Sequence, residues 1–219
     1  MNQSQTFEDR RWSNWSQPLV FRHKAALKYL APRGSLLDVG CGDGLFLSIA
    51  QSKDLECTGV DFSESALSAL SLRNLSVRTV QADIMVTGLP FEDDTFDMVT
   101  ALDVLEHVLE PAKLLRELSR VSRGSLVLSV PNFSSLPSRL QCLAGKVPEN
   151  NRLKKGHVYW FNWRNLNQIL NDNNLEIINW SCNFQAANIP LFGSLMAWLS
   201  RIMPNLFALS FVVLVQKKQ

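Results

Sequence analysis

The sequence predicts an α/β fold with a mostly parallel sheet covered by helices on both faces. Apolar runs of strand length alternate with helical patterns through most of the 219 residues. Near-continuous apolar strands joined by helices are typical of parallel sheets with both faces buried. The chain is 46% hydrophobic and 19% charged, an ordinary globular balance. Its length suits a single domain with a sizeable core, so we expect residues 1–219 to form one domain.

The predicted elements follow from apolar periodicity. We expect strands at 35–39, 57–61, 77–83, 96–102, 125–130, 175–180 and 206–215, and helices at 45–53, 63–73 and 110–121. Ser63 is a candidate N-cap, and Glu64 favours the positive end of the helix dipole. In the third helix Leu114, Leu115 and Leu118 have helical spacing and should face the sheet.

Two regions depart from this alternation. Residues 1–30 form a leading segment with a helical pattern over 18–30, and residues 133–163 form a long insertion after the fifth strand. Long structured insertions in compact domains are commonly lids or binding loops. We therefore expect these two regions to form a lid over the site that takes a second substrate.

Charge, cysteine usage and the chain ends limit the class of protein. The net charge of +2 is too small to indicate a nucleic-acid-binding protein. The N-terminus has no apolar core of a secretory signal, and the four cysteines are scattered, so we expect free thiols and a cytoplasmic location. The apolar stretch 190–215 is interrupted by Arg201, Pro204 and Asn205. We expect a packed helix, a turn and a buried strand there, with interfacial contact with lipid-linked substrates as the alternative.

Acidic residues follow four successive strands. Asp38, Asp61, Asp83 and Asp103 fall at or just past the carboxyl ends of the first four strands. Ligands of open α/β sheets bind in the crevice outside those ends. A single acid of this kind is explained equally well as a cap or turn former. Four in succession predict a binding site along one edge of the sheet.

The stretch LLDVGCGDG, residues 36–44, places Gly40, Gly42 and Gly44 directly after the first strand. Such glycines let a ligand rest against bare backbone near a helix N-terminus, where N–H groups point outward. Asp61 ends the next strand, where a carboxylate can accept hydrogen bonds from ribose hydroxyls. The pattern predicts a nucleoside-containing ligand. Leu45 occupies the position where the dinucleotide fingerprint G-x-G-x-x-G has its third glycine, which argues against NAD.

Residues 34–132 resemble a class I S-adenosylmethionine-dependent methyltransferase, motif by motif. The resemblance rests on LLDVGCGDG, GVDFS, QADI and FDMVTALDVLEHV in this order. It implies a three-layer Rossmann-like sandwich with a seven-stranded sheet whose last strand, here 206–215, is antiparallel. It also implies S-adenosylmethionine as the cofactor. Carried over by motif, the cofactor-binding residues are Asp38, Gly40, Cys41, Gly42 and Gly44, with Asp61 and Phe62 for the ribose, Asp83 and Ile84 for the adenine, and Leu102 and Asp103 near the sulfonium.

The acceptor side resembles two groups of relatives. The segment LDVLEHV is similar to ubiquinone-type O-methyltransferases, and residues 130–148 are similar to methionine-biosynthesis W-type proteins. His107 is our candidate base for an acceptor that must lose a proton, and His157 and Tyr159 are candidate contacts from the insertion. Asp103, Glu106 and His107 could also ligate a divalent ion, but Asp103 is assigned to the cofactor, so we expect no metal site.

The sequence therefore predicts an enzyme that methylates a small-molecule or a lipid- or sugar-linked acceptor, with oxygen or carboxyl as the target. It predicts that the protein has no nucleic-acid partner. It leaves peripheral membrane contact and the oligomeric state open. The alternative is a non-catalytic cofactor-binding protein that regulates a biosynthetic enzyme, as W-type relatives would. Cofactor binding without turnover, together with a stable complex with another enzyme, would favour that alternative.

Overall fold

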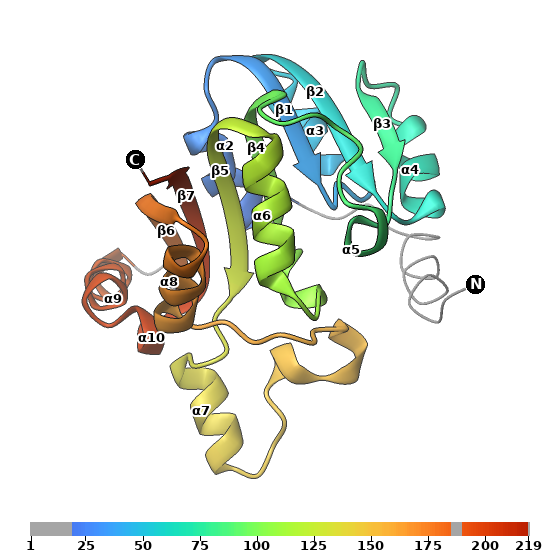
Figure 1. Ribbon diagram of the computed structural model, residues 1–219. Helices are drawn as coiled ribbons and strands as arrows, with labels where there is room; N and C mark the ends of the chain where they lie inside the picture. The colour runs from blue at the N-terminus through green and yellow to red at the C-terminus, as the bar shows by residue number, and fades with distance from the viewer. Residues whose placement is uncertain (1–18, 185–189, 219) are drawn as a thin grey trace. The chain divides into compact units, whose positions relative to one another are not determined.

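The computed structural model describes residues 19–184 and 190–218 (Figure 1). The predicted 1–30 segment and its expected helix therefore lie partly outside the described residues. Within the described part, α2 spans Phe21–Tyr29 and ends shortly before the first strand begins at Arg33. No helix in the described ranges is long and apolar enough to cross a membrane.

The seven-stranded sheet has the order β3-β2-β1-β4-β5-β7-β6. The strands are β1 Arg33–Val39, β2 Asp54–Asp61, β3 Arg78–Gln81, β4 Phe96–Leu102, β5 Ser122–Pro131, β6 Leu175–Phe184 and β7 Ala208–Lys217. β1 is parallel to β2 and β4, and β2 is parallel to β3. β7 is antiparallel to β6. Every predicted strand is present, and the antiparallel last strand is confirmed.

Helices occupy the predicted intervals between the strands. They are α3 Leu45–Ala50, α4 Glu64–Ser71, α5 Ile84–Thr87, α6 Pro111–Val121, α7 Leu136–Leu143, α8 Trp163–Asp172, α9 Pro190–Ile202 and α10 Pro204–Phe207, with the 3-10 turns η1 Leu105–His107, η2 Glu149–Asn151 and η3 Leu153–Lys155. Ser63 caps α4 as predicted, because its hydroxyl accepts from the Ala66 amide at 3.2 Å. The expected turn near Pro204 is the short helix α10.

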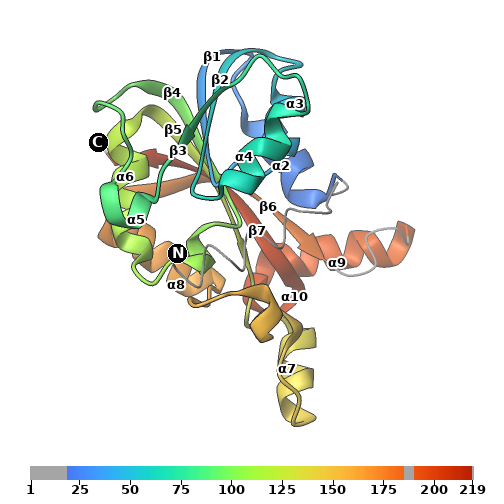
Figure 2. The same ribbon diagram turned by 90° about the vertical axis from the view of Figure 1, so that its right-hand side faces the viewer.

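The chain divides into two compact units. Among the described residues, unit 1 comprises 19–102 and 116–127, and unit 2 comprises 103–115, 128–184 and 190–218. In unit 1, α2, α3 and α4 lie on one side of β1 and β2 (Figure 2). Leu36, Leu37, Val60 and Val99 are fully buried in its core. Burial of such strand residues on both faces is the physical reason that these apolar runs form parallel strands.

Unit 2 has its own core, built on β6, β7 and α8. Phe161, Leu166 and Phe211 are each at most 1% exposed. The ring of Trp163 lies 4.5 Å from that of Trp180 and 5.2 Å from that of Phe211, centroid to centroid. The insertion therefore ends in a core-facing aromatic segment, while its middle is built from α7, η2 and η3.

Candidate functional site

The loop after β1 needs its glycines for its own conformation. Gly40, Gly42 and Gly44 have φ of 70°, 53° and 75°, in the left-handed region that other residues rarely adopt. A Cβ added at Gly44 would lie 2.6 Å from Leu70 Cγ on α4. The close approach of α4 and the positive φ both exclude a side chain at this position, so the loop presents bare backbone.

The amides of this loop turn inward. The Gly40 and Cys41 amides donate to the Val60 carbonyl at 2.8 and 3.1 Å, and the Gly42 amide donates to Asp61 Oδ2 at 2.9 Å. These three amides of the loop are therefore taken by the end of β2, ahead of the N-terminus of α3 at Leu45. The loop thus offers a surface of glycine backbone rather than a row of donors for phosphate.

Asp61 fixes the loop and the start of α4 together. Its second oxygen, Oδ1, accepts from the Ser63 amide at 2.9 Å, and the residue is only 6% exposed. A carboxylate that accepts from two backbone amides is strongly oriented. The sequence predicted a strand-end acid at this place but not that it would hold the glycine loop.

Asp38 carries an unusual carboxyl group one residue before the end of β1. It is 3% exposed, and its Oδ1 accepts from Thr100 Oγ1 at 2.6 Å. Burial raises the pKa of Asp38 to about 7, with a further upward push from the charge of Asp61, although the Thr100 hydrogen bond acts in the opposite direction. Because burial disfavours the ionised form, a proton or a neighbouring cation is needed to balance this carboxyl near neutral pH.

The sequence did not predict an ion pair that also holds the glycine loop. Asp43 is 4% exposed and forms an ion pair with Arg73, whose Nε also donates to the Asp43 carbonyl at 2.6 Å. Arg73 lies just after α4. The loop is therefore tied to the end of α4 as well as to Asp61. No short-range pattern links positions 43 and 73, and only the packing of α4 brings them together.

The remaining residues proposed for the cofactor in unit 1 lie at or just past the ends of β2, β3 and β4. Asp83 is exposed and caps α5, accepting from the Met85 amide at 3.1 Å. Phe62, Ile84 and Leu102 are half-buried. Because β1 to β4 are parallel, their carboxyl ends share one edge. In the structure Asp83 acts as the N-cap of α5. The sequence analysis left this role open for any single acid at a strand end.

Asp103 directly follows β4 and has a strained backbone. Its φ is 56°, a region that costs free energy for a residue other than glycine. Its amide donates to Ser129 Oγ at 2.8 Å, and Ser129 Oγ donates back to Asp103 Oδ1. Unit 2 therefore holds Asp103 in one orientation through β5.

The structure brings the rings of His107 and His157 together and fixes the backbone of Tyr159 beside Glu106. The rings of His107 and His157 lie 4.9 Å apart in an edge-to-face arrangement. The amides of Val158 and Tyr159 both donate to the Glu106 carbonyl, at 2.9 and 3.0 Å. These two bonds fix the end of the insertion against η1, so residues about 50 positions apart along the chain form one cluster, which we call the histidine cluster (Glu106, His107, His157 and Tyr159).

Hydrogen bonding sets the chemical state of the histidine cluster. His107 Nδ1 lies 3.2 Å from the Gly156 carbonyl. A carbonyl oxygen can only accept, so Nδ1 carries the proton and donates this hydrogen bond. Burial, together with the charge on a protonated His107, lowers the pKa of His157 to about 4. His157 is therefore neutral near pH 7.

Glu106 adds a buried carboxylate to these imidazoles. It is 1% exposed, and its Oε1 lies 3.9 Å from His157 Nε2. Three candidate ligand atoms lie within 4.8 Å of one another, one each from Glu106, His107 and His157. The arrangement can accept a proton, and its donor set also suits a divalent ion. The sequence singled out Glu106 only as a possible metal ligand together with Asp103 and His107.

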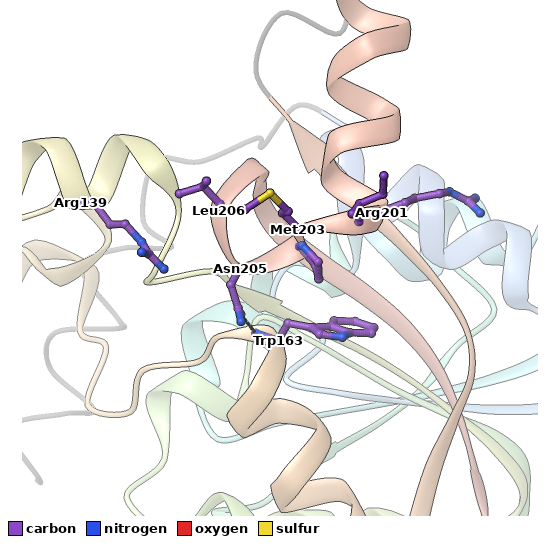
Figure 3. Close-up of a pocket in the computed structure, with 8 residues that line it drawn as sticks. Arg139, Trp163, Arg201, Met203, Asn205 and Leu206 are labelled. Carbon is purple, nitrogen blue, oxygen red and sulfur yellow. Dashed lines mark hydrogen bonds between the residues drawn. The ribbon is translucent and has the colours of Figure 1, made fainter.

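A separate hollow lies elsewhere in unit 2. It has a volume of about 460 Å³ and is lined by residues of α7, α8, α9 and α10 (Figure 3). Asn205 Oδ1 accepts from the Trp163 amide at 2.7 Å on its wall. None of the residues proposed for cofactor or catalysis lines this hollow.

Comparison with known proteins gives the family. The methyltransferase domain family matches residues 9–179. A probable S-adenosylmethionine-dependent methyltransferase of Mycobacterium tuberculosis is 34% identical over 116 residues, covering 51% of this chain and 42% of that protein. A ubiquinone biosynthesis O-methyltransferase of Pseudomonas paraeruginosa is 33% identical over 106 residues, covering 45% of this chain and 44% of that protein. The chain thus spans less than half the length of these two relatives.

Solved structures share the fold. An S-adenosylmethionine-dependent methyltransferase from Mesorhizobium loti superposes with a TM-score of 0.65 at 19% identity, covering 88% of this chain and 96% of that one. Magnesium protoporphyrin IX methyltransferase from Synechocystis was solved with bound S-adenosylhomocysteine. It superposes with a TM-score of 0.66 at 18% identity, covering 98% of this chain and 95% of that one. The Rossmann-like sandwich predicted from the motifs is confirmed.

Proposed function

The chain belongs to the methyltransferase domain family, and from that premise we propose that it methylates an oxygen of a small-molecule or a lipid- or sugar-linked acceptor, with S-adenosylmethionine as the donor. The observation that carries the proposal is the glycine loop fixed by Asp61 beside the buried carboxyl of Asp38. Bare backbone suits a ligand that packs closely, and buried acids suit a cationic one. The residues present therefore fit a sulfonium nucleoside.

Each part of the cofactor has proposed partners. The backbone of the glycine loop and Cys41 would hold the methionine portion, with Asp38 beneath it. Asp61 and Phe62 would hold the ribose, and Asp83 and Ile84 the adenine. Leu102 and Asp103 would lie near the sulfonium, which supplies a methyl group for in-line displacement. Family resemblance supports these assignments, and two backbone amides, those of Gly42 and Ser63, hold the Asp61 carboxylate in one orientation.

His107 is proposed as the base for the acceptor. A hydroxyl acceptor must lose its proton as the methyl group arrives, and a neutral imidazole near pH 7 can take it. The Gly156 carbonyl orients the ring so that Nε2 receives the proton. His157 stays neutral beside it, which limits like-charge repulsion when His107 becomes positive. Tyr159, anchored through Glu106, is proposed to contact the acceptor.

Binding and turnover test the proposal separately. Titration calorimetry with S-adenosylmethionine, S-adenosylhomocysteine and NAD should show heat for the first two only. A methyl-transfer screen over a metabolite library, read by product mass, should then identify the acceptor. Cofactor binding with no turnover on any oxygen acceptor, together with a stable complex with another enzyme, would support a regulatory protein instead.

A matched pair of variants tests the base. In His107→Asn the amide nitrogen can keep the hydrogen bond to Gly156 while the group at the Nε2 position is lost, whereas His107→Gln loses that bond. We expect His107→Asn to keep cofactor affinity and to lose turnover by about 10²–10⁴-fold. Turnover at the wild-type rate would assign His107 to structure. Turnover that disappears with a chelator and returns with a divalent ion would assign the histidine cluster to metal binding.

A further inference from the structure

Helix α9 exposes an apolar face. Leu195, Trp198 and Ile202 are 48%, 59% and 56% exposed. They are spaced three and four residues apart, so they lie along one side of the helix. Tryptophan is favoured at membrane–water interfaces because its ring is apolar and its N–H is polar. A stripe of this kind differs from the singly scattered apolar residues found on most surfaces.

Helix α7 in the insertion exposes a second apolar face of the same design. Leu136, Leu140 and Leu143 are 38%, 55% and 84% exposed, and their spacing places them on one side of α7. The chain after α7 continues with Val147 and Leu153, which are 60% and 97% exposed. Figure 2 shows α7, which follows β5, lying away from the strands β6 and β7 of its own unit.

Basic residues accompany both helices. The insertion has five basic residues and a single acid, Glu149; the basic residues are Arg139, Lys146, Arg152, Lys154 and Lys155. Arg139 of α7 and Arg201 of α9 line the same hollow, together with exposed Ile202 and Met203 (Figure 3). The residues that line the hollow, all within the described part of the chain, include no acid. The hollow therefore lies between α7 and α9 and carries one arginine from each helix.

We propose that unit 2 docks on the surface of an anionic lipid bilayer through α7, α9 and the hollow between them. Leucines and tryptophan enter the headgroup boundary, and the arginines and lysines meet lipid phosphates. This inference goes beyond the proposed function and holds for any acceptor. A nucleic acid would use the cations but not the leucine stripes, and a protein partner would not require the excess of cations. The combination therefore favours an anionic bilayer.

The test is flotation of the full chain with phosphatidylcholine vesicles, with and without phosphatidylglycerol. We expect binding to the vesicles that contain phosphatidylglycerol and a loss of binding as salt is raised, because salt screens exposed charges. Arg139→Gln with Arg201→Gln should weaken binding by about 25-fold, at about fivefold for each basic residue. The matched control, Lys24→Gln with Lys28→Gln, removes two exposed cations from α2 of unit 1 and should bind as the wild type does.

The apolar contribution is tested with Leu143→Ser and Trp198→Ser combined, against Leu72→Ser, which changes an 83% exposed leucine of unit 1. The first should lose most vesicle binding and the second none. Circular dichroism checks that each variant folds, and the salt dependence of the wild type tests the proposal without any variant. Absence of binding to phosphatidylglycerol vesicles, equal binding by all variants, or displacement of vesicles by an oligonucleotide would overturn it.

The assay separates this inference from the proposed methyl transfer. Flotation needs neither cofactor nor acceptor, so failure of vesicle binding leaves the methyltransferase proposal untouched. Failure of methyl transfer in the metabolite screen likewise leaves the docking proposal intact.

Discussion

Asp38→Asn tests whether ionisation of the buried carboxyl in β1 destabilises the folded protein. The folded pKa of Asp38 is about 7, against an ordinary value of 3.8. A tenfold change in a protonation constant is about 1.4 kcal/mol, so ionising Asp38 in the folded protein costs roughly 4 kcal/mol relative to the unfolded chain. The Thr100 hydroxyl already offsets part of the cost of burial.

The sign of the pH effect follows from linkage. The folded state of Asp38 binds its proton more tightly than the unfolded state, so this carboxyl contributes stability that is present in full below pH 3.8 and is lost as pH rises to about 7. His157 acts in the opposite direction. Its folded pKa of about 4 lies below the ordinary 6.5, so its contribution grows between those values. The difference between wild type and Asp38→Asn isolates the carboxyl.

Urea unfolding of the cofactor-free protein between about pH 5 and pH 8.5 is the assay. The free energy of unfolding of Asp38→Asn should gain about 3 kcal/mol on that of the wild type across this range. Thr100→Val keeps the carboxyl but removes the hydroxyl that stabilises its charge, so the loss of stability should extend to higher pH. Parallel curves for wild type and Asp38→Asn would refute the reasoning, because they would mean that Asp38 ionises as easily in the fold as in water.

Three further outcomes are expected. Gly44→Ala should lower the free energy of unfolding by more than Gly145→Ala does, because both have a positive φ but only Gly44 faces Leu70, while nothing lies within 4 Å of a Cβ at Gly145; equal urea midpoints would contradict the packing argument. The ring protons of His157 should titrate by NMR near pH 4 rather than 6.5, and a midpoint near 6.5 would show that burial does not govern the ring. Binding of S-adenosylmethionine near pH 7 should release protons, measured by calorimetry in two buffers, because a cation favours ionised Asp38; the same release in Asp38→Asn would assign the protons to another group.

The sequence predicted the sheet well because each strand carries its own signal. Runs such as residues 36–39 are buried on both faces, and that requirement fixes them as strands of a covered parallel sheet. The cap at Ser63 is equally local, since its acceptor role depends on an amide three residues away. The glycine loop was predicted for the same reason, because glycine is the residue that readily adopts a positive φ.

What the sequence missed depends on packing between distant segments. The Asp43–Arg73 ion pair forms because α4 returns its end to the loop, and neither residue belongs to a local pattern. The raised pKa of Asp38 depends on complete burial and on Thr100 from another strand. The type of residue predicts that a charge is present, whereas the surrounding fold determines what that charge costs.

The histidine cluster shows how far motif reasoning can reach. His107 was singled out from its place after β4, and His157 and Tyr159 from the insertion, yet no pattern joined them. The joining group is the Glu106 carbonyl, which accepts from Val158 and Tyr159, and a backbone carbonyl carries no residue-specific signal. Since the segment that holds His157 is fixed to η1 rather than extended into solvent, we infer that this end of the insertion serves the acceptor site. The leucines of α7, which remain exposed, are free to serve another surface.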